Sequence, residues 1–312
     1  MAMAVITVAS GGLPVVDVTA STPKLGLPVT EALAGRGMAV TKVAARGMPV
    51  TYSTVADYPP PSGGTSAEAT AFLARTSGLD ATHTNAYTAL IDGLVADGIW
   101  AKLDVLYIYA TDTSVNAVLN LVSTNYNGTI SGSPTFTADR GFTGTDSNTL
   151  NFINPGFNPT TAPSPKSVLN SAHISLWTNA TISGNGSGIV ATQCAFIAPN
   201  HNSGAFYSRI NSANAGGTFS ASAAAGHYLG SRTGVSAIAG YKNGSSVMTD
   251  TQASTSLPNF NYVSLGYNNS GAGTVGSSQQ HAMFSIGSGL NSTEAGNFYA
   301  RLRTYMTVVG VP

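Results

Sequence analysis

The sequence predicts a mainly β protein that ends in an antiparallel β-sandwich. Three observations support this fold class. From residue 110 onward, short apolar stretches alternate with Gly, Asn and Ser turns at regular intervals, as in sandwiches. Charged residues make up only 8% of the chain, against about 25% in typical soluble proteins. Small polar residues replace them, which suits a β-rich protein that is largely covered by its neighbours.

The first 57 residues contain one short phrase four times, starting at Gly12, Gly26, Gly37 and Gly47. Each copy has a Gly, an apolar residue, Pro or Ala, and then Val. A unit with two or three apolar side chains cannot form a core alone, so it must stack on neighbouring units or on other chains. We therefore expect residues 1–57 to form a repeat-containing β arm that anchors the protein in an assembly. The expected anchoring positions are Pro14, Val15, Pro28, Val29, Met38, Val40, Pro49 and Val50.

Residues 58–64, Tyr-Pro-Pro-Pro-Ser-Gly-Gly, are predicted to be a linker. Residues 65–109 follow as a helical hairpin and a strand that leads into the sandwich. Thr65 or Ser66 can cap a helix that continues to Arg75, and Asp80 or Thr82 can start the second helix. Aromatic residues follow at Trp100 and at the tyrosines of the predicted strand 103–109. They can stack on sugars, but the favoured interpretation is that they lie in the core.

The sandwich is expected to occupy residues 110–312. Asn-Gly pairs at 127–128 and 243–244 predict tight hairpin turns. A final helix is expected to start at Asn291 or Ser292, with Glu294 in its first turn. The predicted strands are 135–138, 173–177, 188–197, 205–210, 226–229, 235–241, 262–267 and 281–286.

Parts of this region resemble laminin-G/concanavalin A-like jelly rolls. Three segments are similar to the opening of that family: Asn120-Leu121-Val122, the Tyr126–Thr129 turn and the stretch 134–142. Two further segments, 173–177 and 240–244, are similar to its middle. The ending, 282–287 followed by a capped helix, is similar to variants in proteins of tailed phages. The arm, helical pair and sandwich together resemble phage fibres, spikes or capsid decorations.

The composition argues against several kinds of chemistry. Net charge is zero, so there is no electrostatic case for nucleic acid. Residues 151–312 contain only two acidic residues, Asp250 and Glu294, in unrelated contexts, whereas glycoside hydrolysis usually needs a matched carboxylate pair. We therefore predict no catalytic residues and no enzyme. The alternative, a polysaccharide-degrading enzyme on the same scaffold, would depend on these two acids.

No cofactor or metal is predicted. The histidines do not show the spacing of zinc ligands. The acids and Asn residues that calcium-dependent relatives place around the ion are largely missing here. Asp139 and Asp146 with Asn148 are the remaining candidates for a calcium site. Cys194 is expected to be a small buried residue. The five histidines are His83, His173, His201, His227 and His281.

A lectin-like site needs only aromatic faces, amides and an Arg, and several predicted loops offer them. The candidate glycan-binding residues are His201, Asn202, Tyr207, Arg209, His227, Tyr228, Arg232, Tyr267 and Asn268. For each of them, a place in a plain turn or a half-buried strand is the competing interpretation.

We expect a structural component of a phage particle, anchored by its arm to capsid or tail proteins and assembled as a homo-oligomer, with a trimer favoured. The sandwich would bind host polysaccharide; a purely architectural packing module is the other alternative. The start of the chain has no cationic and apolar secretory pattern, and no stretch is long enough for membrane insertion. The expected location is therefore the virion, after synthesis in the host cytoplasm.

Overall fold

The computed structural model describes residues 64–145, 151–179, 186–201, 205–213, 218–219, 224–271 and 274–312. These residues belong to one compact unit, Tyr58–Pro312. The predicted repeat arm with all eight anchoring positions, from Pro14 to Val50, lies outside the described residues, as does the linker up to residue 63.

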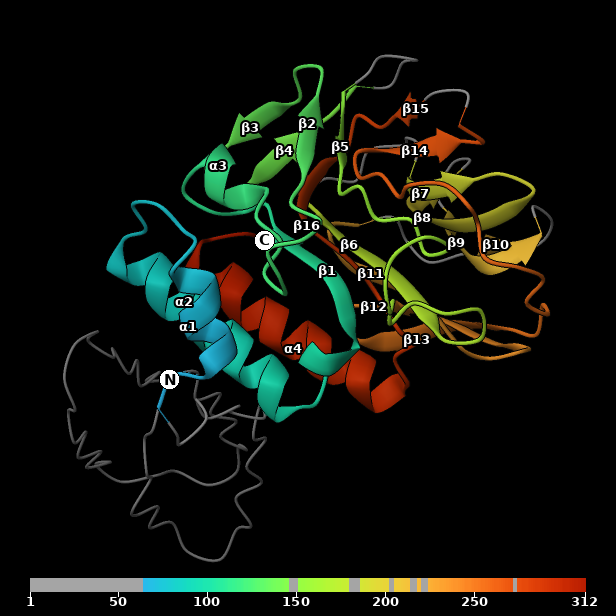
Figure 1. Cartoon of the computed structure of the whole chain (residues 1–312), viewed down its shortest axis with the longest axis horizontal. Helices are drawn as coiled ribbons and strands as arrows, with labels where there is room; N and C mark the ends of the chain where they lie inside the picture. Colours follow the sequence, from blue (N-terminus) through green and yellow to red (C-terminus); the bar gives the residue numbers. More distant parts are fainter. Residues whose placement is uncertain are drawn as a thin grey trace, which may run out of the picture. The chain divides into compact units, whose positions relative to one another are not determined.

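The described part is built from three layers: a group of helices, an eight-stranded sheet and a six-stranded sheet (Figure 1). The prediction of a mainly β sandwich with a C-terminal helix is confirmed. The helices are α1 (Ala67–Leu73), α2 (Ala81–Ala96), α3 (Ser114–Ala117) and α4 (Ser292–Val308), with a 3-10 turn, η1 (Trp100–Lys102).

The eight-stranded sheet lies in the middle of the three layers. Its strand order is β13 (Ser245–Asp250), β12 (Ala237–Lys242), β11 (Gly226–Gly234), β6 (Ala172–Thr178), β16 (Gln280–Gly287), β4 (Gly141–Thr143) and β3 (Thr135–Thr137), and β1 (Leu103–Ile108) also pairs with β16. Because β1 is part of this sheet, the helical segment and the sandwich share a core.

The six-stranded sheet forms the second face of the sandwich. Its order is β10 (Thr218–Phe219), β9 (Ala205–Ala213), β8 (Gln193–His201), β7 (Ser187–Val190), β14 (Gly266–Asn269) and β15 (Thr274–Gly276). The pair β7–β14 is parallel, and the other pairs in both sheets are antiparallel. A small separate sheet joins β2 (Thr129–Ser131) to β5 (Phe152–Asn154).

Strand β6 shows how the core is divided. Side chains alternate between the two faces of a strand, so Ile174 and Leu176 pack into the core between the sheets, while Trp177 packs against the helices. Both faces of β6 are buried, so its polar residues His173, Ser175 and Thr178 lie in the interior together with its apolar ones.

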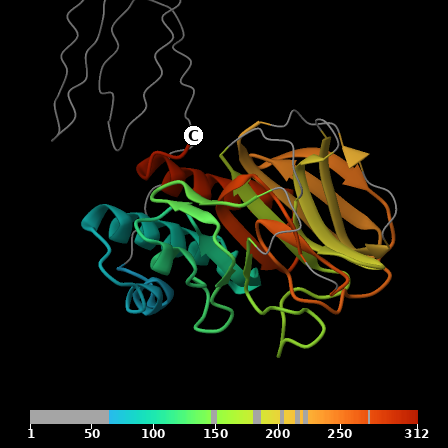
Figure 2. The same cartoon turned by 90° about the horizontal axis from the view of Figure 1, so that it is seen from above.

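Helices α1, α2 and α4 begin where the sequence predicts, whereas the short helix α3 lies in a stretch that was predicted to hold strands and turns. Ser66 caps α1 and Asp80 caps α2 by accepting backbone N–H groups three residues later. Asn291 and Glu294 form a reciprocal capping box at the start of α4. Figure 2 shows the helical layer on one side of the molecule, with the yellow strands of the six-stranded sheet on the other. No helix in the described ranges is long and apolar enough to cross a membrane.

Candidate functional site

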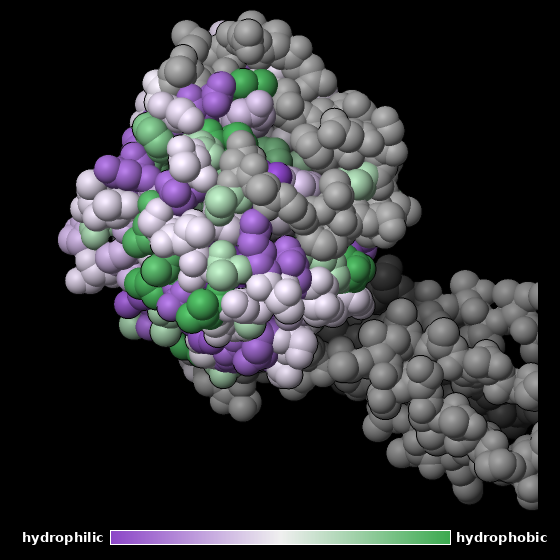
Figure 3. Space-filling view, turned by 90° about the vertical axis from the view of Figure 1, so that its right-hand side faces the viewer, coloured by the Kyte–Doolittle hydropathy of each residue, from purple (hydrophilic) through white to green (hydrophobic). Residues whose placement is uncertain are grey.

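The outer face of the six-stranded sheet is the main candidate surface. Helices α1, α2 and α4 cover the outer face of the eight-stranded sheet, with which they share one hydrophobic cluster. In the part of the chain that the structure describes, no helix packs on the outer face of the six-stranded sheet. Figure 3, which views the molecule from this end of Figure 1, shows hydrophilic and hydrophobic residues interspersed among the described atoms.

A row of paired residues crosses four strands on this face. Tyr267 on β14 pairs with Gly188 on β7, Gly188 pairs with Phe196 on β8, and Phe196 pairs with Arg209 on β9. Gly188 has a φ of +120°, and an added Cβ would lie 2.1 Å from the Ala195 carbonyl oxygen, so this position requires glycine. Without a side chain between them, the rings of Tyr267 and Phe196 meet edge to face, with centroids 5.4 Å apart.

Tyr207 extends this aromatic row. Its ring lies 5.9 Å from that of Phe196 and under the guanidinium of Arg209, whose Cζ is 4.6 Å from the ring centroid. Arg209 Nη1 also lies 3.9 Å from Cys194 Sγ. Phe196 and Tyr207 are only 4% and 6% exposed, whereas Tyr267 and Arg209 are half-buried. The first pair therefore supports the cluster, and the second pair is partly exposed at its surface. We call these four residues, Phe196, Tyr207, Arg209 and Tyr267, the aromatic row.

A β-bulge on β9 lies next to the aromatic row. The register slips between Cys194 and Ala195, and Asn211 takes a positive φ of 52°. The Asn211 amide donates to the carbonyl oxygens of Val168 and Leu169 at 3.0 and 3.1 Å. These two hydrogen bonds hold the bulge in place. A bulge changes the direction in which neighbouring side chains point.

A hollow of about 190 Å³ opens at the end of the same strands. Its lining residues are uncharged: Ala191, Thr192, Gln193, Leu257, Pro258, Asn259, Phe260 and Ser270. The hollow lies where β8 begins and β14 ends, and Ser270 N–H donates to the Val190 carbonyl at 3.0 Å. Two of its lining residues, Ala191 and Phe260, belong to or pack on the core between the sheets, so the hollow opens at the edge of the sandwich. Hydroxyls, amides and one aromatic ring surround a space with no formal charge.

Asn268 shapes this region rather than presenting a free amide. Its Nδ2 donates to the Asn261 carbonyl at 3.1 Å, and its Oδ1 accepts the Gly271 N–H at 2.9 Å. These two bonds hold the turn that places Tyr267 and Ser270. The structure thus brings together four of the predicted residues, Tyr207, Arg209, Tyr267 and Asn268, in one region.

Three other predicted residues lie in the interior. His227, Tyr228 and Arg232 are 1%, 0% and 0% exposed on β11, a strand between β6 and β12. Their physical roles are structural, as their neighbours show. His227 stacks with Trp177 and Tyr299, and Tyr228 packs against Phe206 in the core. Neither ring is accessible to a saccharide.

Arg232 is a buried cross-link between segments. Its guanidinium donates to the carbonyl oxygens of Ile210, Gly234, Val235 and Gln252, at 2.8, 3.2, 2.5 and 3.0 Å. The last two predicted residues cannot be placed in the site: the side chain of His201 and all of Asn202 lie outside the described residues.

Phe196, Gln193 and Phe260 contribute to the site but are not among the predicted residues. Phe196 lies in the apolar run that was expected to be one strand, 188–197. The structure divides this run into β7 and β8, joined by a turn at 191–192. Only the pairing register shows that Phe196 faces outward while Ala195 and Ile197 face the core.

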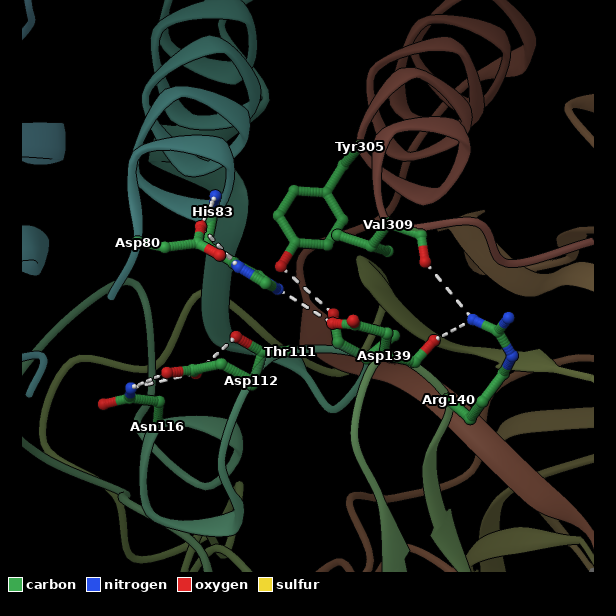
Figure 4. A network of polar contacts seen from close by, with 10 residues as sticks. Asp80, His83, Thr111, Asp112, Asn116, Asp139, Arg140, Tyr305 and Val309 are labelled. Carbon is green, nitrogen blue, oxygen red and sulfur yellow. Dashed lines mark hydrogen bonds and ion pairs between the residues drawn. The ribbon is translucent and has the colours of Figure 1, made fainter. Parts of the chain in front are cut away.

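A second polar cluster surrounds His83, where α2, the β3–β4 turn and the end of α4 meet (Figure 4). His83 Nδ1 lies 2.8 Å from Asp80 Oδ1, and its Nε2 lies 2.8 Å from Asp139 Oδ1. Burial alone would lower the pKa of His83, but its hydrogen bonds to the two carboxylates outweigh this and raise the pKa. An imidazolium can donate from both nitrogens and satisfy both acids, which a neutral ring cannot.

The geometry of this cluster is that of a structural bridge. Both ring nitrogens of His83 are occupied by carboxylates, so neither serves a substrate as a base. Arg140 Nη1 donates to the carbonyls of Asp139 and Val309 at 2.7 and 3.2 Å, which connects the turn to the end of α4. The cluster therefore fastens the helices to the edge of the sandwich.

The acids considered for catalysis and metal binding are held in other interactions. Asp250 accepts the N–H of Gln252 at 3.1 Å. Glu294 caps α4 and pairs with Lys102 at 2.6 Å. Asp146 and Asn148 lie outside the described residues. Within the described ranges, no group of three or more His, Cys, Asp or Glu side chains is arranged to hold a metal ion.

Comparisons with known proteins find low similarity. No model of a known protein family matches the chain, and no curated protein matches it. Among solved structures, the binding domain of Paraclostridial Mosquitocidal Protein 1 is similar at 12% identity, with a TM-score of 0.43, over 64% of this chain and 52% of that one. The receptor binding domain of botulinum neurotoxin C/D mosaic serotype is similar at 12% identity and a TM-score of 0.44, over 65% and 52%.

A third similar structure is domain 4 of AbnA, a GH43 extracellular arabinanase from Geobacillus stearothermophilus, in complex with arabinotriose. It has 15% identity and a TM-score of 0.37, over 63% of this chain and 98% of that one. The chain spans about half the length of the two toxin domains.

Proposed function

We propose that this protein is a saccharide-binding structural component of a phage particle. Its sandwich binds host surface glycan at the outer face of the six-stranded sheet, and its N-terminal arm attaches it to other virion proteins. The observation that carries the binding function is the half-buried Tyr267 ring, which packs with Phe196 and Tyr207 on the outer face of the six-stranded sheet. A neutral hollow lined by amides and hydroxyls opens at the end of the same strands. A sugar offers both an apolar face for a ring and hydroxyls for such groups.

The protein binds the saccharide without cleaving it in this proposal. Hydrolysis of a glycosidic bond usually needs two carboxylates near the scissile bond. The sequence has no Asp or Glu between Asp146 and Asp250, a stretch that includes strands β6 to β12. Strands β14 and β15 also contain no Asp or Glu.

Replacement of Tyr267 by Ala is expected to weaken saccharide binding about tenfold, since one well-placed aromatic contact contributes about 1.4 kcal/mol. The measurement is a glycan array with the full chain, followed by titration of the strongest ligand with both proteins. Release of smaller sugars from that ligand would show catalysis and contradict the binding-only function.

The matched control is Trp100→Ala. Trp100 is another half-buried aromatic residue, at a hollow of about 350 Å³ beside α1 that Glu68 and Arg75 also line. Binding should survive this change. Loss of binding in Trp100→Ala but not in Tyr267→Ala would move the site to the helical side, and an array with no ligand would refute saccharide binding.

The particle role is supported by the four repeats in residues 1–57, because a unit with only two or three apolar side chains is too short to form a core of its own. The full chain is therefore expected to form an oligomer, with a trimer favoured, whose copies add avidity to weak individual sites. Light scattering coupled to size-exclusion chromatography measures this mass directly. A monodisperse monomer of 31.6 kDa would contradict the anchoring role.

A further inference from the structure

We propose that the neutral hollow at the edge of the sandwich holds a single uncharged sugar unit at one end of a glycan chain. This inference rests on the saccharide-binding function proposed above and names the part of the glycan that is recognised. The protein then binds chain ends rather than the middle of a chain. The contact with Tyr267, on the outer face of the six-stranded sheet, is separate from this one.

The size of the hollow limits its occupant to one sugar ring. Its volume is about 190 Å³, whereas pockets for drug-sized molecules measure about 300–1,000 Å³. Its inner end is closed, because Ala191 belongs to the core between the sheets and Phe260 packs against that core. A glycan chain therefore has no path through the hollow, and only an end unit can enter it.

The lining matches the two kinds of surface that a sugar presents. Leu257, Pro258 and Phe260 offer apolar groups to the C–H faces of a sugar ring. Thr192 and Gln193 offer a hydroxyl and an amide, which can both donate to and accept from sugar hydroxyls. Thr192 is exposed and Gln193 is half-buried, so both polar groups can reach a ligand.

The loop that carries the apolar side chains is fixed by hydrogen bonds to the segment 157–160. Asn158 Nδ2 donates to Asn259 Oδ1 at 3.0 Å, and the Thr160 hydroxyl donates to the Pro258 carbonyl at 3.2 Å. A wall that is already ordered loses little conformational entropy when a ligand binds, which favours affinity.

The turn that places Ser270 at the hollow is fixed as well. Ser270 N–H donates to the Val190 carbonyl at 3.0 Å, and Asn268 Oδ1 accepts the Gly271 N–H at 2.9 Å. Two segments that are far apart in the sequence, the turn at 191–192 and the turn after β14, are thereby held together at the hollow. The shape of the hollow does not depend on a ligand.

The charge of the lining determines the class of sugar. Among the described residues that line the hollow, none carries a formal charge. An ionised carboxylate would lose water on entry without gaining a cationic partner, which is costly. Neutral hydroxyls can exchange water for the amide and hydroxyl groups of the lining at little cost. The end unit is therefore an uncharged sugar.

The test counts chain ends. The strongest ligand of the glycan array is partially hydrolysed in acid until its mean length is halved, which doubles the number of ends per gram and leaves most of the chain interior unchanged. Calorimetric titration then compares the native and the shortened glycan with the wild-type full chain. We expect the shortened glycan to bind about twice as many protein molecules per gram, because each molecule has one such hollow and holds one end.

Variants at the hollow test its position. Thr192→Tyr, which adds a ring where the end unit would lie, should weaken binding about tenfold. Gln193→Leu removes the amide but keeps a side chain of similar size, and should weaken binding about threefold. The matched control is Thr249→Tyr, which adds the same ring at an exposed threonine on the edge strand β13, and it should bind like wild type.

Each outcome separates the two proposals. Equal binding per gram before and after shortening overturns end recognition, and a charged end unit overturns the neutral class; both leave saccharide binding in place. Unchanged affinity in both Thr192→Tyr and Gln193→Leu overturns the hollow as the site. An array without any ligand overturns saccharide binding itself. The comparison of lengths uses the wild-type protein, so it remains decisive even where the variants fold poorly.

Discussion

Acidification from pH 8 to pH 5 is expected to destabilise the sandwich by about 2 kcal/mol for each of three buried histidines, His173, His227 and His281. Burial lowers the pKa of His173 to about 4 and those of His227 and His281 to about 3. In the unfolded chain these rings recover an ordinary pKa near 6.5. The unfolded state therefore binds more protons in this pH range.

The sign of the effect follows from this difference. Where a folded pKa is lowered, the stabilisation is complete above pH 6.5 and is lost as pH falls toward the folded pKa. His83 acts in the opposite direction, because its pKa is raised, but one group does not offset three. A total loss of about 6 kcal/mol is comparable with the whole stability of many domains, so unfolding near pH 5 is expected.

The surroundings of His173 and His227 explain why these two rings stay neutral. His173 Nδ1–H donates to the Ser288 carbonyl at 2.6 Å, and its Nε2 lies 3.0 Å from Ser285 Oγ. His227 lies among aromatic rings, and neither of its nitrogens has a hydrogen-bond partner within the described residues. Protonation would place a charge in this apolar space at high cost.

The measurement is urea unfolding of the full chain at several pH values. The slope of the free energy of unfolding against pH counts the protons taken up on unfolding. His227→Phe, which keeps an aromatic ring in the stack, should reduce this slope by about one proton. A stability that does not change between pH 8 and pH 5 would show that the rings are not buried as described.

Replacement of Arg232 by Met is expected to cost about 3–5 kcal/mol of stability. Met has a side chain of similar length but donates no hydrogen bond. The change therefore removes the donors to three carbonyl groups, one on β9, one at the β11–β12 turn and one after β13. Arg232→Lys should lose less, because an ammonium can still reach some of them.

Arg209→Gln provides the matched control for Arg232, since Arg209 is half-buried on the sheet surface and changes there usually cost little. Thermal or urea unfolding compares the three variants with wild type. A loss below about 1 kcal/mol in Arg232→Met would contradict the role of Arg232 as a buried cross-link.

The sequence allows the helices and the fold class to be predicted because their signals are local. The caps at Ser66, Asp80 and Asn291 are set by a few neighbouring residues. Turn residues and short apolar runs likewise indicate strands wherever those strands pair. These features need no knowledge of the tertiary structure.

The arrangement of the site depends on strand order and register, which a single sequence does not contain. Tyr228 and Arg232 read as polar loop candidates, yet β11 lies inside the sheet, where both faces are covered. Phe196 reads as core, and only its pairing with Gly188 and Arg209 places it on the outer face. Tyr267 and Arg209 are 58 residues apart in sequence and meet in one row because four strands align.

Hydrogen–deuterium exchange of the full chain, with and without a saturating saccharide, tests the central claim most directly. Binding at the outer face of the six-stranded sheet should protect peptides from 187–197, 205–213 and 257–271, which contain the aromatic row and the hollow. Protection confined to 67–75 and 121–124, which line the hollow beside α1, would contradict the account.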